Sequence, residues 1–351
     1  MRVIIHMGLP KTGTSAVQTW LVDRAPDLFD HGILMPTNLV GPSGNARLLA
    51  AALHEPGPSR SPHQGGLIEG LRSALAMPKA TDLLISSEYY EKVMFRPPLI
   101  QRSQAALRAV GASWDVGVIF LRNLFDLLNS SFAQNLKVGP YPLDFAGFLA
   151  MRREKRVNDF AANVANLRRA GVDVRLAVYG GGGSQTEILI QKAGLRDQLP
   201  ADFGFETART NESVGVLGLI AARRFWALVD ALIPQSLPKV RGELARLLIN
   251  AAHSIRDRPY NGFTPELRTL TEAHYAAILS AVATDLSAEE SRALCMSRSI
   301  DLPASSLQEA DLALSDRTIL ADLLHRIADG IAASPKLANQ VPETFRHHLT
   351  G

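Results

Sequence analysis

Cysteine is almost absent from this sequence. Cys295 is the single one among 351 residues, so the chain cannot form an internal disulfide, and a metal site built from several cysteines is excluded. A lone cysteine usually packs as a small hydrophobic side chain, and we expect Cys295 to be buried.

Long apolar runs and blocks of like charge are also missing. The longest apolar run, residues 214–222, is about half of the roughly 18 residues needed to cross a bilayer. The first apolar stretch is interrupted by His6 and followed at once by Lys11, unlike a secretory signal peptide, so we expect a cytoplasmic location. The net charge of +3 comes without a basic tail, which permits anionic ligands but does not indicate nucleic acid.

The apolar share of 46% and the charged share of 20% are typical of a globular protein with a sizeable core. Short apolar runs alternate with amphipathic stretches, which predicts an α/β fold with a mostly parallel sheet flanked by helices. The predicted strands are residues 3–7, 32–36, 82–87, 114–121 and 174–179. The predicted helices that separate them are residues 14–25, 45–53, 66–76, 100–110, 124–137 and 144–170.

From residue 214 onward the pattern is almost wholly helical, ending in an amphipathic stretch at 319–331. We therefore expect an α/β core over 1–212 and a helical C-terminal region over 213–351, packed on the core. Two segments rich in glycine, proline or serine are predicted loops: residues 55–66, either a cover over a site or a surface excursion, and the four glycines 180–183.

The residues that carry the strongest functional signal are GLPKTGTS at 8–15, between the first strand and the first helix. Small residues let the backbone curl so that successive N–H groups point at one anion, and the helix N-terminus adds positive potential. Thr12, Thr14 and Ser15 add hydroxyl groups. This pattern predicts a phosphate-binding loop; the alternative is a tight turn capped by Thr14 or Ser15.

The loop is not a Walker A motif, although Gly8 and Gly13 have the same spacing. A Walker lysine follows the second glycine and works beside Mg²⁺ held by an acid at another strand end. Here the lysine is Lys11, inside the loop, and Glu88 is the only acid that ends a predicted strand. The sequence therefore favours a phosphate ligand over Mg²⁺-dependent ATP chemistry, and predicts no metal site.

Residues 6–18, HMGLPKTGTSAVQ, resemble the 5′-phosphosulfate-binding loop of sulfotransferases that use 3′-phosphoadenosine 5′-phosphosulfate (PAPS). The resemblance implies a P-loop-type core. It also implies that Lys11 contacts the oxygen between phosphate and sulfate, while Thr12, Gly13, Thr14 and Ser15 hold the 5′-phosphate.

A second anion site is predicted where the strand 114–121 ends in Arg122, because ligands of open α/β sheets gather at the carboxyl ends of strands. Asn123 and Asp126 are explained as a helix cap, but Arg122 is not. Residues 120–130 resemble the 3′-phosphate motif of the same family, with Arg122 and Ser130 at its two key positions. Leu124 replaces a proline common in cytosolic members.

A third element, RTNES at 209–213, resembles a stretch of bacterial sulfotransferase-like proteins, which would place Arg209 and Asn211 at the nucleotide. The alternative is a helix entry capped by Asn211 or Ser213.

Transfer to a hydroxyl or amine needs a base. Glu88 is one candidate, at a predicted strand end, and the bacterial relatives carry a comparable Ser-Ser-Glu; its alternative is a capping or hydrogen-bonding carboxylate. His54 and His63 are others, whereas His6 is expected to be packed. Tyr89 and Tyr90 could line an acceptor pocket or belong to the core.

The resulting hypothesis is a metal-free sulfotransferase that moves a sulfuryl group from PAPS to a glycan, lipid or small-molecule acceptor. Two alternatives remain open: a P-loop nucleotide or small-molecule kinase, and a nucleotide-binding protein without catalysis. The sequence gives no indication of oligomeric state.

Overall fold

The structure, a computed structural model, describes residues 1–9, 11–55, 61–180, 183–207, 214–255, 257–297 and 302–351. The chain forms two compact units. The first comprises Met1–Leu124, Asn158–Thr210 and Tyr275–Met296, and the second comprises Phe125–Val157, Asn211–His274 and Ser297–Gly351. The boundary predicted at residue 212 lies outside the described residues and stays a prediction.

The strands are β1 (Arg2–Gly8), β2 (Ile33–Leu34), β3 (Asp82–Ser86), β4 (Ser113–Leu121) and β5 (Asp173–Val178). The helices between them are α1 (Thr14–Asp23), α2 (Ala25–Asp30), η1 (Thr37–Leu39), α3 (Arg47–His54), α4 (Pro62–Leu75), α5 (Tyr90–Met94), α6 (Pro97–Ala109), α7 (Leu124–Val138), α8 (Phe145–Glu154) and α9 (Phe160–Arg169). After the last strand come α10 (Gln185–Ala193), η3 (Arg196–Gln198), α11 (Val216–Leu232), α12 (Pro238–His253), α13 (Pro265–Ala283), α14 (Ala288–Cys295), η4 (Glu309–Asp311), α15 (Leu314–Ala333), α16 (Pro335–Ala338) and α17 (Glu343–Thr350).

The first unit is built on a five-stranded sheet in the order β2-β3-β1-β4-β5. Every pair is parallel, with Ile5 of β1 opposite Ile85 of β3 and Gly117 of β4. The predicted α/β class with a parallel sheet is therefore confirmed. Because β1 is central and β3 and β4 flank it, the residues that follow these three strands emerge at one edge of the sheet.

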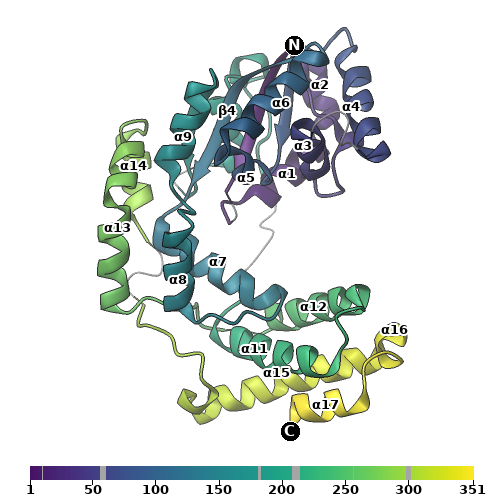
Figure 1. Cartoon of the computed structure of the whole chain (residues 1–351), viewed down its shortest axis with the longest axis vertical. Helices are drawn as coiled ribbons and strands as arrows, with labels where there is room; N and C mark the ends of the chain where they lie inside the picture. Colours follow the sequence, from purple (N-terminus) through teal and green to yellow (C-terminus); the bar gives the residue numbers. More distant parts are fainter. Residues whose placement is uncertain (10, 56–60, 181–182, 208–213, 256, 298–301) are drawn as a thin grey trace. The chain divides into compact units, whose positions relative to one another are not determined.

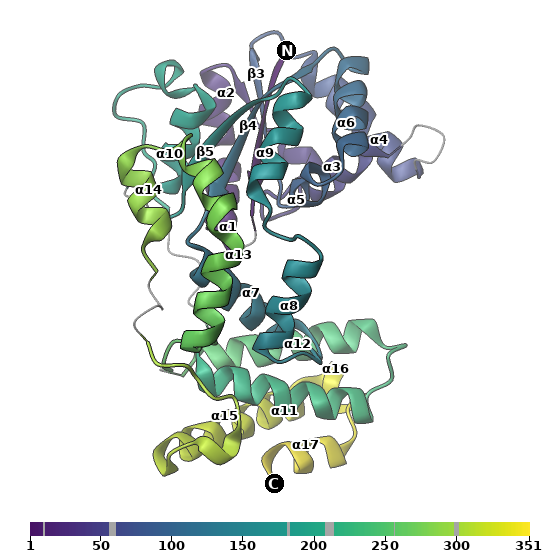
Figure 2. The ribbon, with the colours of Figure 1, turned by 60° about the vertical axis from the view of Figure 1, so that its left-hand side comes forward.

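Helices cover both faces of this sheet, as Figures 1 and 2 show. One face carries Ile4, Leu84 and Phe120, which form a core with α1, α2 and α10. On the other face α5, α6 and α9 contact β1, β4 and β5. Because both faces are covered, the strands are near-continuous apolar runs. Four of the five strands begin and end within one residue of their predicted bounds.

The helix predicted over 144–170 is wrong: two helices, α8 and α9, occupy this range. Between them Arg156 and Asn158 have positive φ angles of 50° and 80°, which a helix cannot contain. Asp159 then starts α9 by accepting a hydrogen bond from the Ala162 N–H.

The loop predicted over 55–66 is too long, because α4 begins at Pro62. Ser61 and Gln64 form a reciprocal capping box, and Pro62 takes the first helical position. Residues 56–60 lie outside the described part of the chain. The prediction that Cys295 is buried is also wrong, because it ends α14 with its side chain exposed.

The second unit is made of helices and loops in its described residues. Helix α11 packs against α12, α15 and α17, with Phe225 against Phe345 in its core. The Trp226 indole donates to the Lys137 carbonyl at 3.1 Å, which ties α11 to the end of α7. No helix in the described ranges is both long and apolar enough to cross a membrane.

Candidate functional site

The connection from β1 to α1 has the backbone of an anion-binding turn. Lys11 and Gly13 have φ angles of 70° and 77°, whereas Thr12 between them has a negative φ. Such alternation turns successive peptide N–H groups toward one point. Gly8 closes the other side, because a Cβ there would lie 1.8 Å from Cγ2 of Thr14. The two glycines that define the motif are thus required sterically.

The amide groups of Thr12, Gly13, Thr14 and Ser15 donate no hydrogen bond to any described residue. The first intrahelical donors of α1 are Ala16 and Val17, which both bond to the Gly13 carbonyl. Four consecutive donors at a helix N-terminus that have no partner among the described residues could all bind one phosphate group. Phosphate binding by this loop stays a prediction, and the backbone geometry is compatible with it.

The hydroxyl groups of Thr12 and Thr14 bond to other groups of the protein, and the predicted contacts of the loop hydroxyl groups with an anion stay a prediction. Thr12 is buried and donates to the Leu9 carbonyl at 2.6 Å, so its side chain stabilises the turn. Thr14, also buried, donates to a carboxylate oxygen of Glu88. Ser15 is exposed. The contribution of Thr12 to an anion would thus come through its backbone N–H.

Arg122 lies beside the loop, as predicted from its place at the end of β4. Its Nη1 donates to the Lys11 carbonyl at 2.6 Å, which holds the left-handed residue in place. Its guanidinium lies over the Tyr179 ring, 5.3 Å from the centroid. This side chain therefore links the loop to the ends of two neighbouring strands, β4 and β5.

Tyr179 is a residue of this site that the sequence did not reveal. It follows β5, and its N–H donates to the Leu121 carbonyl at 2.7 Å. A Cβ on Gly13 would lie 2.7 Å from the Tyr179 ring, so the ring packs directly on the loop. No motif marks this tyrosine; only the sheet order, which places β5 beside β4, brings it here.

Lys11, Arg122 and Glu88 form a charged group around the loop. Burial lowers the pKa of Lys11; the Glu88 carboxylate opposes this shift, and the positive charge of Arg122 adds to it. Lys11 thus interacts with one carboxylate and one like charge beside the N-terminus of α1. An anion that entered the loop would relieve the repulsion between Lys11 and Arg122.

Glu88 is positioned by the residues that end β3. The Ser87 N–H donates to the His6 carbonyl at 3.0 Å, which continues the pairing with β1. The Ser87 hydroxyl donates to Asn45 at 3.1 Å. These bonds fix the backbone one residue before Glu88, so its carboxylate is held beside Thr14 and Lys11.

His54 and Tyr89 form a stacked pair in the same unit, with ring centroids 5.3 Å apart. Nδ1 of His54 donates to the Ala50 carbonyl at 2.8 Å, so the lone pair is on Nε2, 3.5 Å from the Tyr89 hydroxyl. Burial lowers the pKa of His54, partly offset by its bond to Ala50. The neutral imidazole of His54 therefore contacts Tyr89, the residue that follows Glu88 in the chain.

The other predicted site residues lie elsewhere or outside the described residues. His63 is exposed on α4. Ser130 lies on α7, in the second unit. The residues Arg209 and Asn211 lie outside the described part of the chain. The predicted cap residue Asn123 donates its amide to the Leu294 carbonyl at 2.8 Å. Tyr90 is fully buried, in the core.

No family model, curated protein or solved structure matches this chain. Among the described residues, no three His, Cys, Asp or Glu side chains gather in a way that could hold a metal ion.

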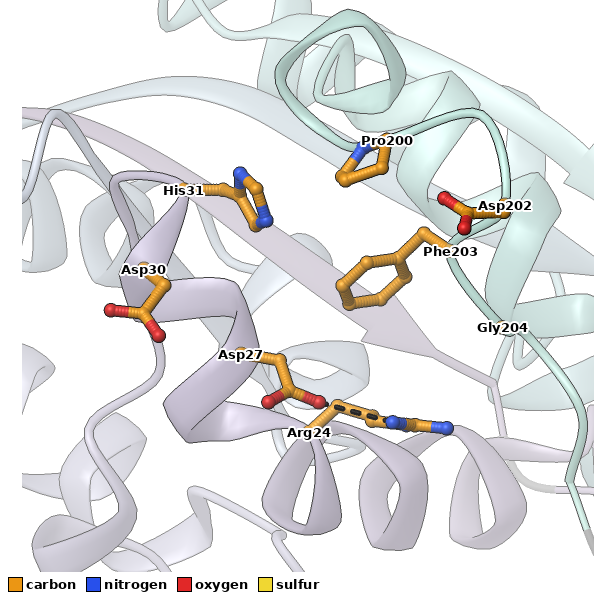
Figure 3. A pocket seen from close by; sticks show the side chains of 8 residues that line it. All are labelled: Arg24, Asp27, Asp30, His31, Pro200, Asp202, Phe203 and Gly204. Atoms are coloured by element: carbon orange, nitrogen blue, oxygen red, sulfur yellow. Dashed lines mark hydrogen bonds and ion pairs between the residues drawn. The ribbon is translucent and has the colours of Figure 1, made fainter.

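A separate hollow of about 460 Å³ lies in the first unit, lined by Arg24, Asp27, Asp30, His31, Pro200, Asp202, Phe203 and Gly204 (Figure 3). His31 precedes β2, so the hollow belongs to the amino edge of the sheet, whereas the loop follows the carboxyl end of β1. Its wall holds the Arg24–Asp27 ion pair at 3.0 Å and three carboxylates in all. This mixed, largely acidic lining does not suit a phosphate.

Substituting Gly13 by alanine is expected to remove anion binding and to lower the free energy of unfolding. The left-handed φ costs a non-glycine residue about 1–3 kcal/mol, and the new Cβ would push on the Tyr179 ring. Gly171→Ala is the matched control, because it has a φ of 81° and nothing within 4 Å. Thermal unfolding with and without phosphate measures both effects. If phosphate raised the melting temperature of Gly13→Ala as much as that of Gly171→Ala, the loop would not be the anion site.

His6 is packed, as expected, and makes the fold sensitive to acid. Burial lowers its pKa from 6.5 to about 3, and its Nδ1 pairs with the Ser86 hydroxyl at 2.9 Å. Below pH 6.5 the unfolded chain therefore binds a proton at His6, whereas the folded chain does not. The free energy of unfolding falls by up to about 1.4 kcal/mol per pH unit between pH 6.5 and pH 3. His6→Asn, which keeps a partner for Ser86, is expected to flatten this slope in denaturant titrations; an unchanged slope would contradict it.

Proposed function

We propose that the chain is a PAPS-dependent sulfotransferase whose first unit is a P-loop-type core. The observation that carries the proposal is the loop itself: four unpaired amides in a left-handed turn, with Lys11 inside it and Arg122 bound to the Lys11 carbonyl. The resemblance of residues 6–18 and 120–130 to the two nucleotide motifs of that family supports the same conclusion.

We expect the loop and Arg122 to bind a ligand that carries two separate phosphates. The amides of Thr12, Gly13, Thr14 and Ser15 would hold the 5′-phosphate. Arg122, whose guanidinium is anchored on Tyr179 and the Lys11 carbonyl, would meet the 3′-phosphate. Arginine suits this task because its planar fork of donors matches phosphate oxygens. Ser130, Arg209 and Asn211 stay predicted partners of the nucleotide.

PAPS supplies an activated sulfuryl group, bonded through one oxygen to the 5′-phosphate. The ammonium of Lys11 would stabilise the negative charge that this oxygen gains as its bond to sulfur breaks. Because Lys11 is half-buried, the stabilisation is stronger than it would be at an exposed site. Positioning and charge stabilisation would thus do most of the catalysis, without a metal.

The acceptor proton would pass to Glu88 or to His54. Glu88 is closer to the loop, since its carboxylate touches Thr14 and interacts with Lys11. His54 is neutral, and its Nε2 lone pair faces the Tyr89 hydroxyl, so it could accept a proton through that tyrosine. Glu88 is the base that we propose, because it follows β3 at the same sheet edge as Lys11 and Arg122.

A thermal-shift panel tests the proposed function against its rivals. A ligand raises the melting temperature in proportion to the logarithm of its concentration over Kd. Adenosine 3′,5′-bisphosphate is expected to stabilise the protein in the presence of EDTA, and more than AMP does. Stabilisation by ATP with Mg²⁺ alone would indicate a kinase instead.

Slow cleavage of PAPS by water, without any acceptor, then separates an enzyme from a binding protein. Formation of adenosine 3′,5′-bisphosphate and sulfate above the uncatalysed rate is expected. Tight nucleotide binding with no cleavage, and no turnover with any acceptor, would indicate the non-catalytic alternative. We expect the enzyme to act in the cytoplasm on a hydroxyl or amine of a glycan, lipid or small molecule.

A further inference from the structure

The carboxylate of Glu88 already interacts with groups that the proposed phosphate ligand would use. The Thr14 hydroxyl donates to it. A hydroxyl has one hydrogen to donate, so Thr14 cannot bond to Glu88 and to an incoming phosphate at once. Thr14 is also the first residue of α1, and its N–H is among the four unpaired amides. Glu88 therefore touches the loop at a residue that the proposed phosphate would also contact.

The charges around the loop also favour this position of the Glu88 carboxylate. Among the groups that shift the pKa of Lys11, Glu88 is the one negative charge, and Arg122 is a like charge. In the absence of a ligand, Glu88 is thus a counter-ion of Lys11 beside the N-terminus of α1. Moving the Glu88 carboxylate away from these groups costs free energy, and the interactions of an incoming phosphate must compensate for that cost.

We infer that Glu88 is a resident anion of the phosphate loop, displaced by the ligand's phosphate. This inference rests on the proposed function and extends it. The phosphate takes over the Thr14 hydroxyl and the Lys11 ammonium, and the released carboxylate becomes able to accept the acceptor's proton. While Glu88 accepts the hydrogen bond from Thr14, one of its carboxylate oxygens is occupied and is not available to the acceptor.

Two consequences follow for the order of events. The nucleotide must bind before the acceptor can be deprotonated, because the base is released only when phosphate occupies the loop. Nucleotide affinity is also lower than the loop alone would give, because each binding event includes the displacement of Glu88. A variant without the carboxylate should therefore bind the nucleotide more tightly and yet transfer less.

The test compares Glu88→Gln with wild type by calorimetric titration of adenosine 3′,5′-bisphosphate. Removing the charge-assisted competitor is expected to tighten binding by about tenfold. Glu91→Gln is the matched control: it removes the same charge from a half-buried side chain one helical turn further on, and its affinity should stay within about twofold of wild type. Glu88→Asp keeps the charge but shortens its reach, and should bind with an affinity between those of wild type and Glu88→Gln.

The outcomes separate this inference from the proposed function. Tighter binding by Glu88→Gln alone supports the inference. If wild type binds and Glu88→Gln binds equally or more weakly, Glu88 is not a competitor, and the proposed function stands without it. If Glu88→Gln does not fold, the same comparison is made with Glu88→Asp, and affinity equal to wild type overturns the inference. If neither wild type nor the variants bind the nucleotide, both proposals fail.

Discussion

Replacing Lys11 by alanine is expected to lower the rate of sulfuryl transfer, or of PAPS cleavage by water, by at least about 100-fold. Loss of one preorganised donor to a developing negative charge costs about 10²–10³ in rate at other sites of this kind. Lys11 is the one charged side chain among residues 8–15, and its partial burial strengthens its interaction with a nearby anion. The measurement is release of adenosine 3′,5′-bisphosphate under saturating PAPS.

The control for this variant is Lys79→Ala. Lys79 forms an ion pair with Asp30 at 2.7 Å, near the opposite edge of the sheet, so its removal changes the net charge equally but leaves the loop intact. Its rate should equal that of wild type. A Lys11→Ala protein that keeps a near-normal rate would refute the role of Lys11 and leave the loop as a simple strand-to-helix turn.

Replacing Arg122 by alanine is expected to abolish the preference for adenosine 3′,5′-bisphosphate over AMP. The variant loses the positive charge at the end of β4 and the bond to the Lys11 carbonyl. Charge-assisted contacts to phosphate contribute about 1.5–3 kcal/mol each, so the affinity for the bisphosphate should fall by about tenfold to 100-fold. AMP, which lacks the 3′-phosphate, should lose much less.

The comparison of the two nucleotides makes this prediction specific. If both affinities fell equally, Arg122 would act only by holding the left-handed turn at Lys11. Arg122→Lys keeps the charge but loses the fork of donors and the flat contact with Tyr179, and should recover only part of the preference. Arg108→Ala, an exposed change on α6, is the control for net charge and should bind both nucleotides as wild type does.

The residues that were found from the sequence are the ones whose position depends on local chemistry. Gly8 and Gly13 mark the turn because a side chain at either would clash, and Lys11 lies between them. Arg122 and Glu88 were placed at the carboxyl edge because a strand's end can be read from where its apolar run stops. A parallel sheet then brings those ends together without further information.

The features that were missed depend on contacts between distant segments. Tyr179 reaches the loop because β5 is the neighbour of β4, an order that no local pattern encodes. The bond from Thr14 to Glu88 joins residues 74 positions apart, so neither residue type predicts it. The break between α8 and α9 was not predicted, because the amino-acid sequence near Asn158 is also compatible with a continuous helix. The positive φ angle of Asn158, which a helix cannot contain, is visible only in the structure.

The most direct test of the central claim is a crystal structure of the protein with adenosine 3′,5′-bisphosphate. The predicted result places the 5′-phosphate within hydrogen-bond distance of the amides of residues 12–15 and near the Lys11 ammonium, with Arg122 at the 3′-phosphate and the Thr14 hydroxyl no longer bonded to Glu88. A complex in which the nucleotide occupies another part of the molecule, such as the hollow beside His31, and leaves the loop unchanged would contradict the account.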